Sequence, residues 1–384
     1  MSEGEDSRRI LLLEPWLGGA HAAWAEGWRG ASRHRIEVLG LSARHWKWRM
    51  HGAAVTLAGL ARRGAPPDLL VASDLLDLAT FLGLVRAWPK VPVLAYFHEN
   101  QCAYPVSSRR GAEGDADAAG YAFRNFTTAL AADRVAFNSA YNRDSFFEGM
   151  ETLLRRLPDH RGLAELRGLP PRCAVLPVGV EYARLTVLAT RRVPHPEGPL
   201  LLWNHRWEHD KGPEEFFSAL VELVRRGLRF RVALAGERRG ECATPFDRAQ
   251  DLLGERLVAF GPLPREAYLT LLHQSDILPV TSRQDFFGLS VVEALAAGCH
   301  PLLPRRLVYP ELVPPELHEA VLYPEGAFVE RLAALVERGP EADVTGRLSE
   351  AMGKYAWPRL ATDYDRLVDD LTSAAPRVQR TPER

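Results

Sequence analysis

Two acidic residues flank a glycine-containing turn in the C-terminal half of the chain. Asp285 lies just before the turn, and Glu293 lies further along the helix predicted to follow it. The turn and the start of that helix contain Phe286, Phe287, Gly288 and Leu289. Free N–H groups at a helix start favour an anion such as a diphosphate. Asp285 would then reach a sugar hydroxyl, and Glu293 would accept hydrogen bonds from a ribose diol.

An arginine and a lysine follow an apolar strand earlier in the same half. The strand is predicted over Leu200–Trp203, and Arg206 and Lys211 lie on the loop that follows it. An amphipathic helix is predicted over 213–226, with Pro213 in its first turn. Open α/β sheets bind ligands at this edge, so the two cations would neutralise a leaving nucleotide diphosphate. The alternative is a pair of solvated charges. Gly236, after a strand at 231–235, is a candidate for the nucleotide base pocket.

The N-terminal half offers a glycine pair and a polar run, each directly after a predicted strand. Gly18 and Gly19 would let the backbone approach a ligand, although a plain tight turn explains them equally well. The polar run is His98, Glu99, Asn100 and Gln101. Four such residues in a row after an apolar strand are hard to place in a core, so we expect them at a site. A solvated turn is the alternative.

Basic and aromatic residues alternate between His34 and His51. The candidates for a binding surface are Arg44, Trp46, Lys47, Trp48 and Arg49. Basic side chains hold phosphates and tryptophan rings stack on exposed bases, which suits an RNA loop. Tryptophans packed on the domain, or a carbohydrate site, would give the same pattern.

These motifs resemble those of known transferases. The two acidic residues and the Arg206–Lys211 element are similar to the signature of retaining, nucleotide-sugar-dependent glycosyltransferases, with Asp285 in place of the usual glutamate. Further strings resemble the tRNA-queuosine α-mannosyltransferase family: Glu14–His21, Arg44–Gly52, Tyr96–Gln101, Tyr104–Pro105, Phe286–Gly288 and Cys299–Glu311. The resemblance runs from about Ile10 to Pro314.

The resemblance implies a GT-B fold, in which two Rossmann-like domains face each other across a cleft and a C-terminal helix crosses back to the first domain. It implies mannose transfer from GDP-mannose to queuosine in the tRNA anticodon loop. His98, Arg206, Lys211 and Asp285 would be catalytic. The residues that bind the donor would be Gly18, Gly19, Gly236, Phe286, Phe287, Gly288, Leu289 and Glu293. The residues that bind the acceptor would be Glu99, Asn100, Gln101, Arg44, Trp46, Lys47, Trp48 and Arg49. A glycan or lipid acceptor, a nucleotide-sugar epimerase and a silent binding protein are the alternatives.

Composition agrees with a two-domain globular enzyme. The chain has 384 residues, 46% hydrophobic and 25% charged, with a formal net charge of −1. That balance gives no global case for nucleic acid. No apolar run is long enough to span a bilayer, and the charged N-terminus does not resemble a signal peptide. Four widely spaced cysteines form neither a zinc pattern nor a disulfide framework, so we expect a reducing cytoplasm. No His/Cys cluster has metal spacing, and Arg206 and Lys211 would replace the charge of an ion, so we expect no metal and no cofactor.

Short apolar strands alternate with helical stretches, which predicts parallel α/β sheets. Strands are expected at 10–13, 36–39, 69–72, 91–97, 134–138, 173–176, 200–203, 231–235, 257–260, 277–280 and 300–303. The predicted domains are 1–190 and 199–355, joined by a linker at 191–199. A crossover helix at 356–373 and a disordered tail at 374–384 follow. Residues 109–119 read as a flexible loop, so Asp115-Ala116-Asp117, like Asp363-Tyr364-Asp365, is interpreted as solvated charge rather than a metal motif.

Overall fold

The computed structural model describes residues 7–104, 111–186, 195–238 and 244–374. The chain forms two compact units. The first unit comprises the chain up to Gly179 together with the chain from Trp357 onward. The second unit runs from Val180 to Ala356. The units therefore divide ahead of the linker suggested at 191–199, of which residues 191–194 lie outside the described residues. None of the described helices is both long and apolar enough to cross a membrane.

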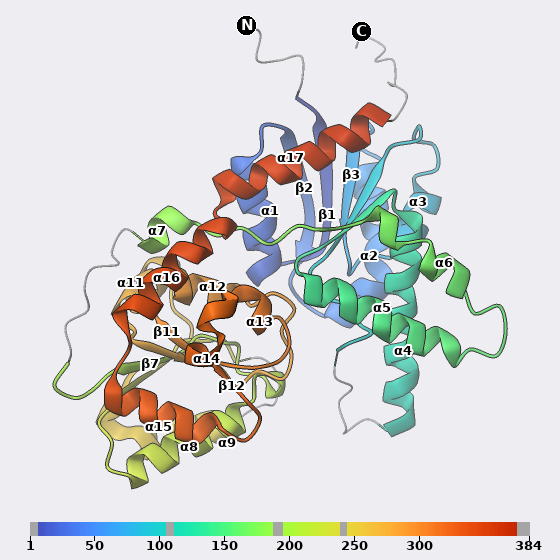
Figure 1. Cartoon of the computed structure of the whole chain (residues 1–384). Coiled ribbons are helices and arrows are strands. Elements are labelled where there is room, and N and C mark those ends of the chain that lie inside the picture. Colours follow the sequence, from blue (N-terminus) through green and yellow to red (C-terminus); the bar gives the residue numbers. More distant parts are fainter. Residues whose placement is uncertain (1–6, 105–110, 187–194, 239–243, 375–384) are drawn as a thin grey trace, which may run out of the picture. The chain divides into compact units, whose positions relative to one another are not determined.

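The first unit is built on a parallel sheet with the order β2-β1-β3-β4-β5-β6 (Figure 1). Its strands are β1 (Arg9–Leu17), β2 (Arg35–Ser42), β3 (Leu69–Ser73), β4 (Val93–Phe97), β5 (Arg134–Phe137) and β6 (Cys173–Val175). Its helices are α1 (Gly19–Ala31), α2 (Trp46–Ala61), α3 (Leu78–Leu84), α4 (Gly111–Ala131), α5 (Ala140–Arg155), α6 (Leu163–Arg167), η1 (Pro170–Arg172) and α17 (Trp357–Ala374). Strands β3 and β4 are buried along their whole length because helices cover both faces.

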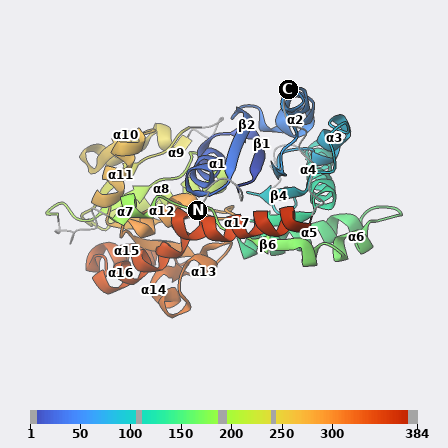
Figure 2. The ribbon, with the colours of Figure 1, turned by 90° about the horizontal axis from the view of Figure 1, so that it is seen from above.

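Each face of this sheet has its own set of helices. Leu11 and Leu13 of β1 share a core with Leu57 of α2, Phe81 of α3 and Phe146 of α5. The opposite face is covered by α1 and α17, which contact each other and the strands. Figure 2 shows α17 along one side of these strands and α2, α3 and α4 along the other.

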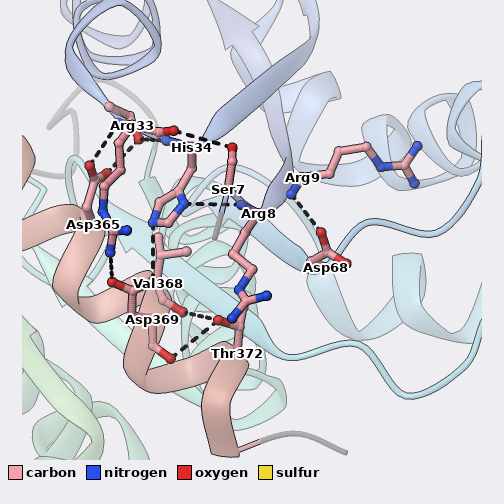
Figure 3. Close-up of polar contacts among 11 residues, drawn as sticks. Ser7, Arg8, Arg9, Arg33, His34, Asp68, Asp365, Val368, Asp369 and Thr372 are labelled. Atoms are coloured by element: carbon pink, nitrogen blue, oxygen red, sulfur yellow. Dashed lines mark hydrogen bonds and ion pairs between the residues drawn. The ribbon is translucent and has the colours of Figure 1, made fainter. Parts of the chain in front are cut away.

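Helix α17 is fastened to the first unit by buried polar contacts. The hydroxyl of Tyr364 accepts from Trp24 Nε1 at 3.0 Å and donates to Tyr96 at 3.0 Å. Asp365 accepts from Ser32 Oγ at 2.6 Å and from the Arg33 backbone at 2.9 Å. Figure 3 shows Asp365 pointing from α17 toward Arg33. Reading Asp365 as a solvated charge was therefore wrong, because α17 turns this carboxylate inward.

The second unit repeats the architecture with the strand order β12-β11-β10-β7-β8-β9. Its strands are β7 (Leu200–Trp203), β8 (Arg231–Leu234), β9 (Leu257–Phe260), β10 (Ile277–Pro279), β11 (His300–Pro304) and β12 (Leu322–Tyr323). Its helical segments are α7 (Tyr182–Thr186), η2 (His209–Lys211), α8 (Pro213–Arg225), α9 (Thr244–Asp247), α10 (Ala249–Leu253), η3 (Gly254–Arg256), α11 (Arg265–Gln274), α12 (Leu289–Ala296), α13 (Tyr309–Leu312), η4 (Pro315–Leu317), α14 (His318–Val321), α15 (Phe328–Arg338), α16 (Ala342–Ala351) and η5 (Met352–Tyr355).

One sequence expectation about local structure was wrong. The segment 109–119, expected to be a loop, enters helix α4 at Gly111, so Asp115 and Asp117 belong to a helix. The later turns of α4 bury Phe126 and Ala129 in the core. A helix anchored in this way extends backward through residues of mixed propensity, because tertiary packing outweighs local preference.

Candidate active site

In the second unit, the predicted anion-binding residues gather where the strand order reverses. Strands β8 and β9 follow on one side of β7, whereas the next strand, β10, lies on the other side of β7. Loops that leave two such strands diverge, which makes the carboxyl edge between them the usual ligand site of open α/β sheets. The β7 loop carries Arg206 and Lys211, and the β10 loop carries Asp285 and Gly288.

Lys211 is the buried cation of this edge. Its Nζ donates to the Gln284 carbonyl at 2.6 Å and lies 3.3 Å from Asp210 and 3.9 Å from Asp285. Its side chain is only 10% exposed. Arg206 differs, because its side chain is 42% exposed and is paired with Glu208 at 3.1 Å. Lys211 therefore fixes the geometry of the two loops, whereas Arg206 is the more exposed cation of this edge.

Asp285 shapes the start of helix α12. One carboxylate oxygen accepts from the Gly288 N–H at 2.8 Å, and the other accepts from the Tyr309 hydroxyl at 3.1 Å. Gly288 has a φ of 76°, a left-handed conformation that favours glycine. The next two N–H groups, of Leu289 and Ser290, belong to the first helical turn, which no helix carbonyl can reach. Phe286 and Phe287 are buried, so only their backbone would face a ligand.

Glu293 lies in a buried polar network rather than alone on its helix. Its carboxylate is 2.7 Å from Arg265 Nη1 and hydrogen-bonds to Tyr268. Burial raises the pKa of Glu293 above its ordinary value, while Arg265 opposes that rise. Asn204 donates to Tyr268 and to the Ser290 carbonyl, which ties the network to the β7 loop. Sequence reasoning missed Arg265 and Tyr268, because their relation to Glu293 depends on contacts between α11 and α12.

Gly236 leaves β8 beside the same edge, where the chain is tightly packed. A Cβ at this position would lie 2.1 Å from the His205 carbonyl oxygen and 2.8 Å from Trp207 Nε1. The close approach of two loops therefore explains this glycine without a ligand. Its predicted role in base binding stays a prediction.

His205 gives the second unit a distinctive response to acid. Burial, followed by the nearby charge of Lys211, lowers the pKa of His205 to about 3. In the unfolded chain, His205 binds a proton as the pH falls below about 6.5, whereas in the folded state it stays neutral. The free energy of unfolding therefore decreases as the pH drops below about 6.5. The neutral variant His205→Asn should lose this dependence. We expect its unfolding free energy to fall less steeply, by about 1 kcal/mol per pH unit between about pH 6 and 4.

Urea unfolding at several pH values measures this slope. The matched control is His209→Asn, because the His209 side chain is 73% exposed. A change of slope in His205→Asn that is absent in the control assigns the effect to the buried imidazole. Parallel pH curves for His205→Asn and the parent would show that His205 does not titrate as its surroundings require.

In the first unit, the polar residues meet near the neighbouring strands β1 and β3. The chain leads from β1 to β2 on one side of this pair and from β3 to β4 on the other. Glu14 of β1, His21 of α1 and His98 after β4 are buried together. The rings of His21 and His98 lie 4.0 Å apart. Burial lowers the pKa of His21, but the carboxylate of Glu14 outweighs it and the pKa rises to about 9. Burial and then charged His21 lower the pKa of His98, which stays neutral.

The run after His98 divides between fold and surface. Asn100 is fully buried and donates to Asn142 and Ser145 of α5, so its side chain holds the loop on the fold. Gln101 is also buried, and its Nε2 donates to Glu99 at 2.8 Å. Glu99 is partly exposed, which makes it the residue of the three best able to meet a ligand.

The glycine pair opens helix α1 and is tightly packed on one side. A Cβ on Gly18 would lie 2.5 Å from that of Ala43, whereas Gly19 faces open space with a φ of 53°. The sequence Gly18-Gly19 thus allows a close loop contact and a left-handed turn in succession. Both features serve the turn itself, and donor binding by this pair stays a prediction.

The basic-aromatic segment covers the end of β2 and the start of α2. Trp46 packs on Tyr121 with ring centroids 5.5 Å apart, and Lys47 lies 5.8 Å from the Trp46 ring. The Trp48 residue is 64% exposed. Arg44 is exposed, and Arg49 donates to Ser42. The segment is therefore ordered secondary structure that presents Trp48 to solvent while it buries part of Trp46.

Comparison with known proteins places this geometry in a family. A family model described as tRNA-queuosine alpha-mannosyltransferase N-terminal matches residues 9–180, and one described as Glycosyl transferases group 1 matches residues 191–356. A relative from Drosophila melanogaster, named tRNA-queuosine alpha-mannosyltransferase, is 35% identical over 314 residues. That match covers 80% of this chain and 82% of the relative.

Solved structures confirm the fold. A sucrose-phosphate synthase from Thermosynechococcus elongatus has a TM-score of 0.66 at 17% identity, covering 96% of this chain and all of that one. A glycosyltransferase from Rickettsia africae has a TM-score of 0.64 at 12% identity, covering 97% of this chain and all of that one. The chain belongs to the tRNA-queuosine alpha-mannosyltransferase family and is a glycosyltransferase with the GT-B fold.

Proposed function

We propose that this enzyme transfers mannose from GDP-mannose to queuosine in the anticodon loop of tRNA, with retention of the anomeric configuration. The observation that carries the proposal is the match to the Drosophila relative, whose 314 aligned residues must include parts of both units. The N-terminal family model, which spans residues 9–180, supports the same acceptor. A cytoplasmic location belongs to the proposal, because tRNA is the substrate.

The second unit supplies the donor chemistry in this proposal. The exposed Arg206 and the buried Lys211 stabilise the diphosphate as it leaves, together with the first N–H groups of α12. Glu293 holds the ribose diol, with Arg265 and Tyr268 fixing its carboxylate. Asp285 contacts the donor sugar from the turn before α12.

The first unit supplies the acceptor chemistry. Neutral His98 accepts or donates a hydrogen bond near the reacting carbon, and Glu99 lies beside it. The acceptor hydroxyl attacks from the face that the diphosphate leaves. Its proton passes to the departing diphosphate oxygen while the new C–O bond forms, so the sugar keeps its configuration and no protein nucleophile is required.

The test is direct transfer in vitro. Purified enzyme is incubated with GDP-mannose and tRNA that contains queuosine, and the nucleosides are analysed by mass spectrometry. A hexose on queuosine supports the acceptor. The same tRNA without queuosine is the control, and UDP-glucose in place of GDP-mannose tests the donor. Free epimerised nucleotide sugar, or transfer to a glycan or lipid but not to tRNA, would contradict the proposal.

Transfer is expected to survive a chelator. The charge of the leaving diphosphate is met by Arg206, Lys211 and the α12 N-terminus, so the reaction does not require a divalent ion. Initial rates with and without EDTA should be essentially equal. Loss of activity in EDTA, with recovery on addition of Mg²⁺ or Mn²⁺, would overturn this part of the proposal.

A further inference from the structure

One carboxylate and two imidazoles form a buried cluster in the first unit. Oε2 of Glu14 lies 3.1 Å from Nδ1 of His21 and 3.8 Å from Nε2 of His98. The three residues are 0%, 8% and 7% exposed, respectively. In the part of the chain that the structure describes, these three form the group whose side chains are placed to hold a metal ion.

Within the described part of the chain, the three atoms that face one another in this cluster lack aligned hydrogen bonds. Among the described residues, Glu14 Oε2, His21 Nδ1 and His98 Nε2 have no aligned hydrogen-bond partner. A buried polar atom left in this state costs about 1–3 kcal/mol. The other oxygen of Glu14 accepts from the Trp16 backbone at 3.0 Å and from Ser73 Oγ at 3.0 Å. Those two bonds fix the carboxylate and direct its second oxygen at the imidazoles.

We propose that Glu14, His21 and His98 form a site for a divalent transition metal, with zinc as the best match. Two imidazoles and one carboxylate are a zinc ligand set, with bonds of about 2.0–2.2 Å in tetrahedral geometry. Such bonds place ligand atoms about 3.3–3.5 Å apart, close to the observed 3.1 and 3.8 Å. The contacts from Trp16 and Ser73 to Glu14 are of the kind that orient a metal ligand from outside.

The bound metal takes the place of the direct Glu14–His21 ion pair and draws the ring of His98 toward the ion. His98 is then withdrawn from substrate, a consequence that rests on the proposed function. Zinc is therefore an inhibitor of the transferase, and a chelator reverses it. This agrees with a reaction that needs no metal, because the ion occupies the first unit rather than the diphosphate site of the second.

Zinc binding is measured without donor or tRNA. A negative result would therefore count against the metal site alone and not against the proposed transferase activity. Chelator-treated full-length protein is titrated with Zn²⁺ by calorimetry and with Co²⁺ by visible absorption. We expect one equivalent per chain and the intense d–d bands of tetrahedral cobalt. His21→Gln should weaken binding by more than about 100-fold, because removal of a direct ligand exceeds the effect of losing an outer contact.

The matched control is His51→Gln, which changes an exposed histidine of α2 outside the cluster. It should bind zinc as the parent chain does. Glu14→Gln is a second variant that removes a proposed ligand. The cobalt spectrum of the parent chain tests the tetrahedral geometry even if both variants fail to fold. Octahedral cobalt bands, no uptake by the parent, or equal affinity in His21→Gln would overturn the proposal and leave the cluster as a buried ion pair.

Discussion

Arg206→Ala is expected to lower kcat by roughly 100- to 1000-fold, the size of effect seen when one donor to a developing negative charge is removed. The guanidinium lies on the loop after β7, in which the preceding residues Asn204 and His205 contact Ser290 of α12. A charge-assisted contact of this kind is strongest when the diphosphate carries its full charge. The folded state should hardly change, because the side chain is 42% exposed and its pairing with Glu208 is a surface contact.

Single-turnover and steady-state kinetics with GDP-mannose measure the effect, and thermal unfolding measures stability in parallel. Arg225→Ala is the matched control, since that side chain is 72% exposed on α8 and pairs with Glu222 of its own helix. It should retain parental rates. Lys211 is a poorer test because it is buried between two carboxylates. A kcat for Arg206→Ala near that of the control would remove Arg206 from the mechanism.

The fold was largely predictable because most of its strands are short and apolar and are separated by helices. The strands at Leu200–Trp203 and Leu257–Phe260 match their predicted bounds. Pro213 opens α8, and Ser139 caps α5 by accepting from the Asn142 N–H at 2.9 Å. These features depend on local chemistry alone, which the sequence displays directly.

Features that depend on distant partners could not be predicted in this way. Strand β12 has only two residues, Leu322 and Tyr323, and is defined by pairing with β11 rather than by a pattern of its own. Asn100 looked like a site residue because its neighbours are polar, yet it is bonded to α5, some forty positions further along the chain. The inward turn of Asp365 depends on contacts with residues more than three hundred positions away.

The candidate site shows the same division. Sequence motifs supplied Arg206, Lys211, Asp285 and Glu293, and the strand order places all four at one edge of the second sheet. Motifs did not reveal that Arg265 pairs with Glu293. They also left Glu14 and His21 as part of a family string, because their relation to His98 depends on the packing of β1, α1 and the loop after β4 in the folded unit.

Trp48→Ala is expected to weaken tRNA binding by roughly 10- to 100-fold while GDP-mannose binding is unchanged. The ring is 64% exposed at the start of α2, where it can stack on an unpaired base. Loss of one stacked base costs roughly 1–3 kcal/mol. Trp46→Ala should also weaken binding, but its packing on Tyr121 adds a structural cost. Trp48 is therefore the cleaner probe.

The basic side chains around Trp48 should act through phosphates instead. In the triple variant Arg44→Ala, Lys47→Ala and Arg49→Ala, tRNA affinity should fall. Its dependence on salt should become shallower by about 0.7 in log–log slope for each phosphate that the variant no longer neutralises. The slope distinguishes a missing phosphate interaction from a misfolded surface, because misfolding would not change the number of released counterions in this graded way.

Affinity is measured at several salt concentrations for tRNA with and without queuosine, with donor binding measured on the same preparations. The control removes an equal charge from the end of α5 and the loop after it in the same unit, through Arg155→Ala, Arg156→Ala and Arg161→Ala, all exposed. If that control and the α2 triple variant weaken tRNA equally, attraction is only a matter of net charge. If neither Trp48→Ala nor the α2 triple variant changes tRNA affinity, the start of α2 is not the acceptor surface, and the exposed tryptophan requires another partner.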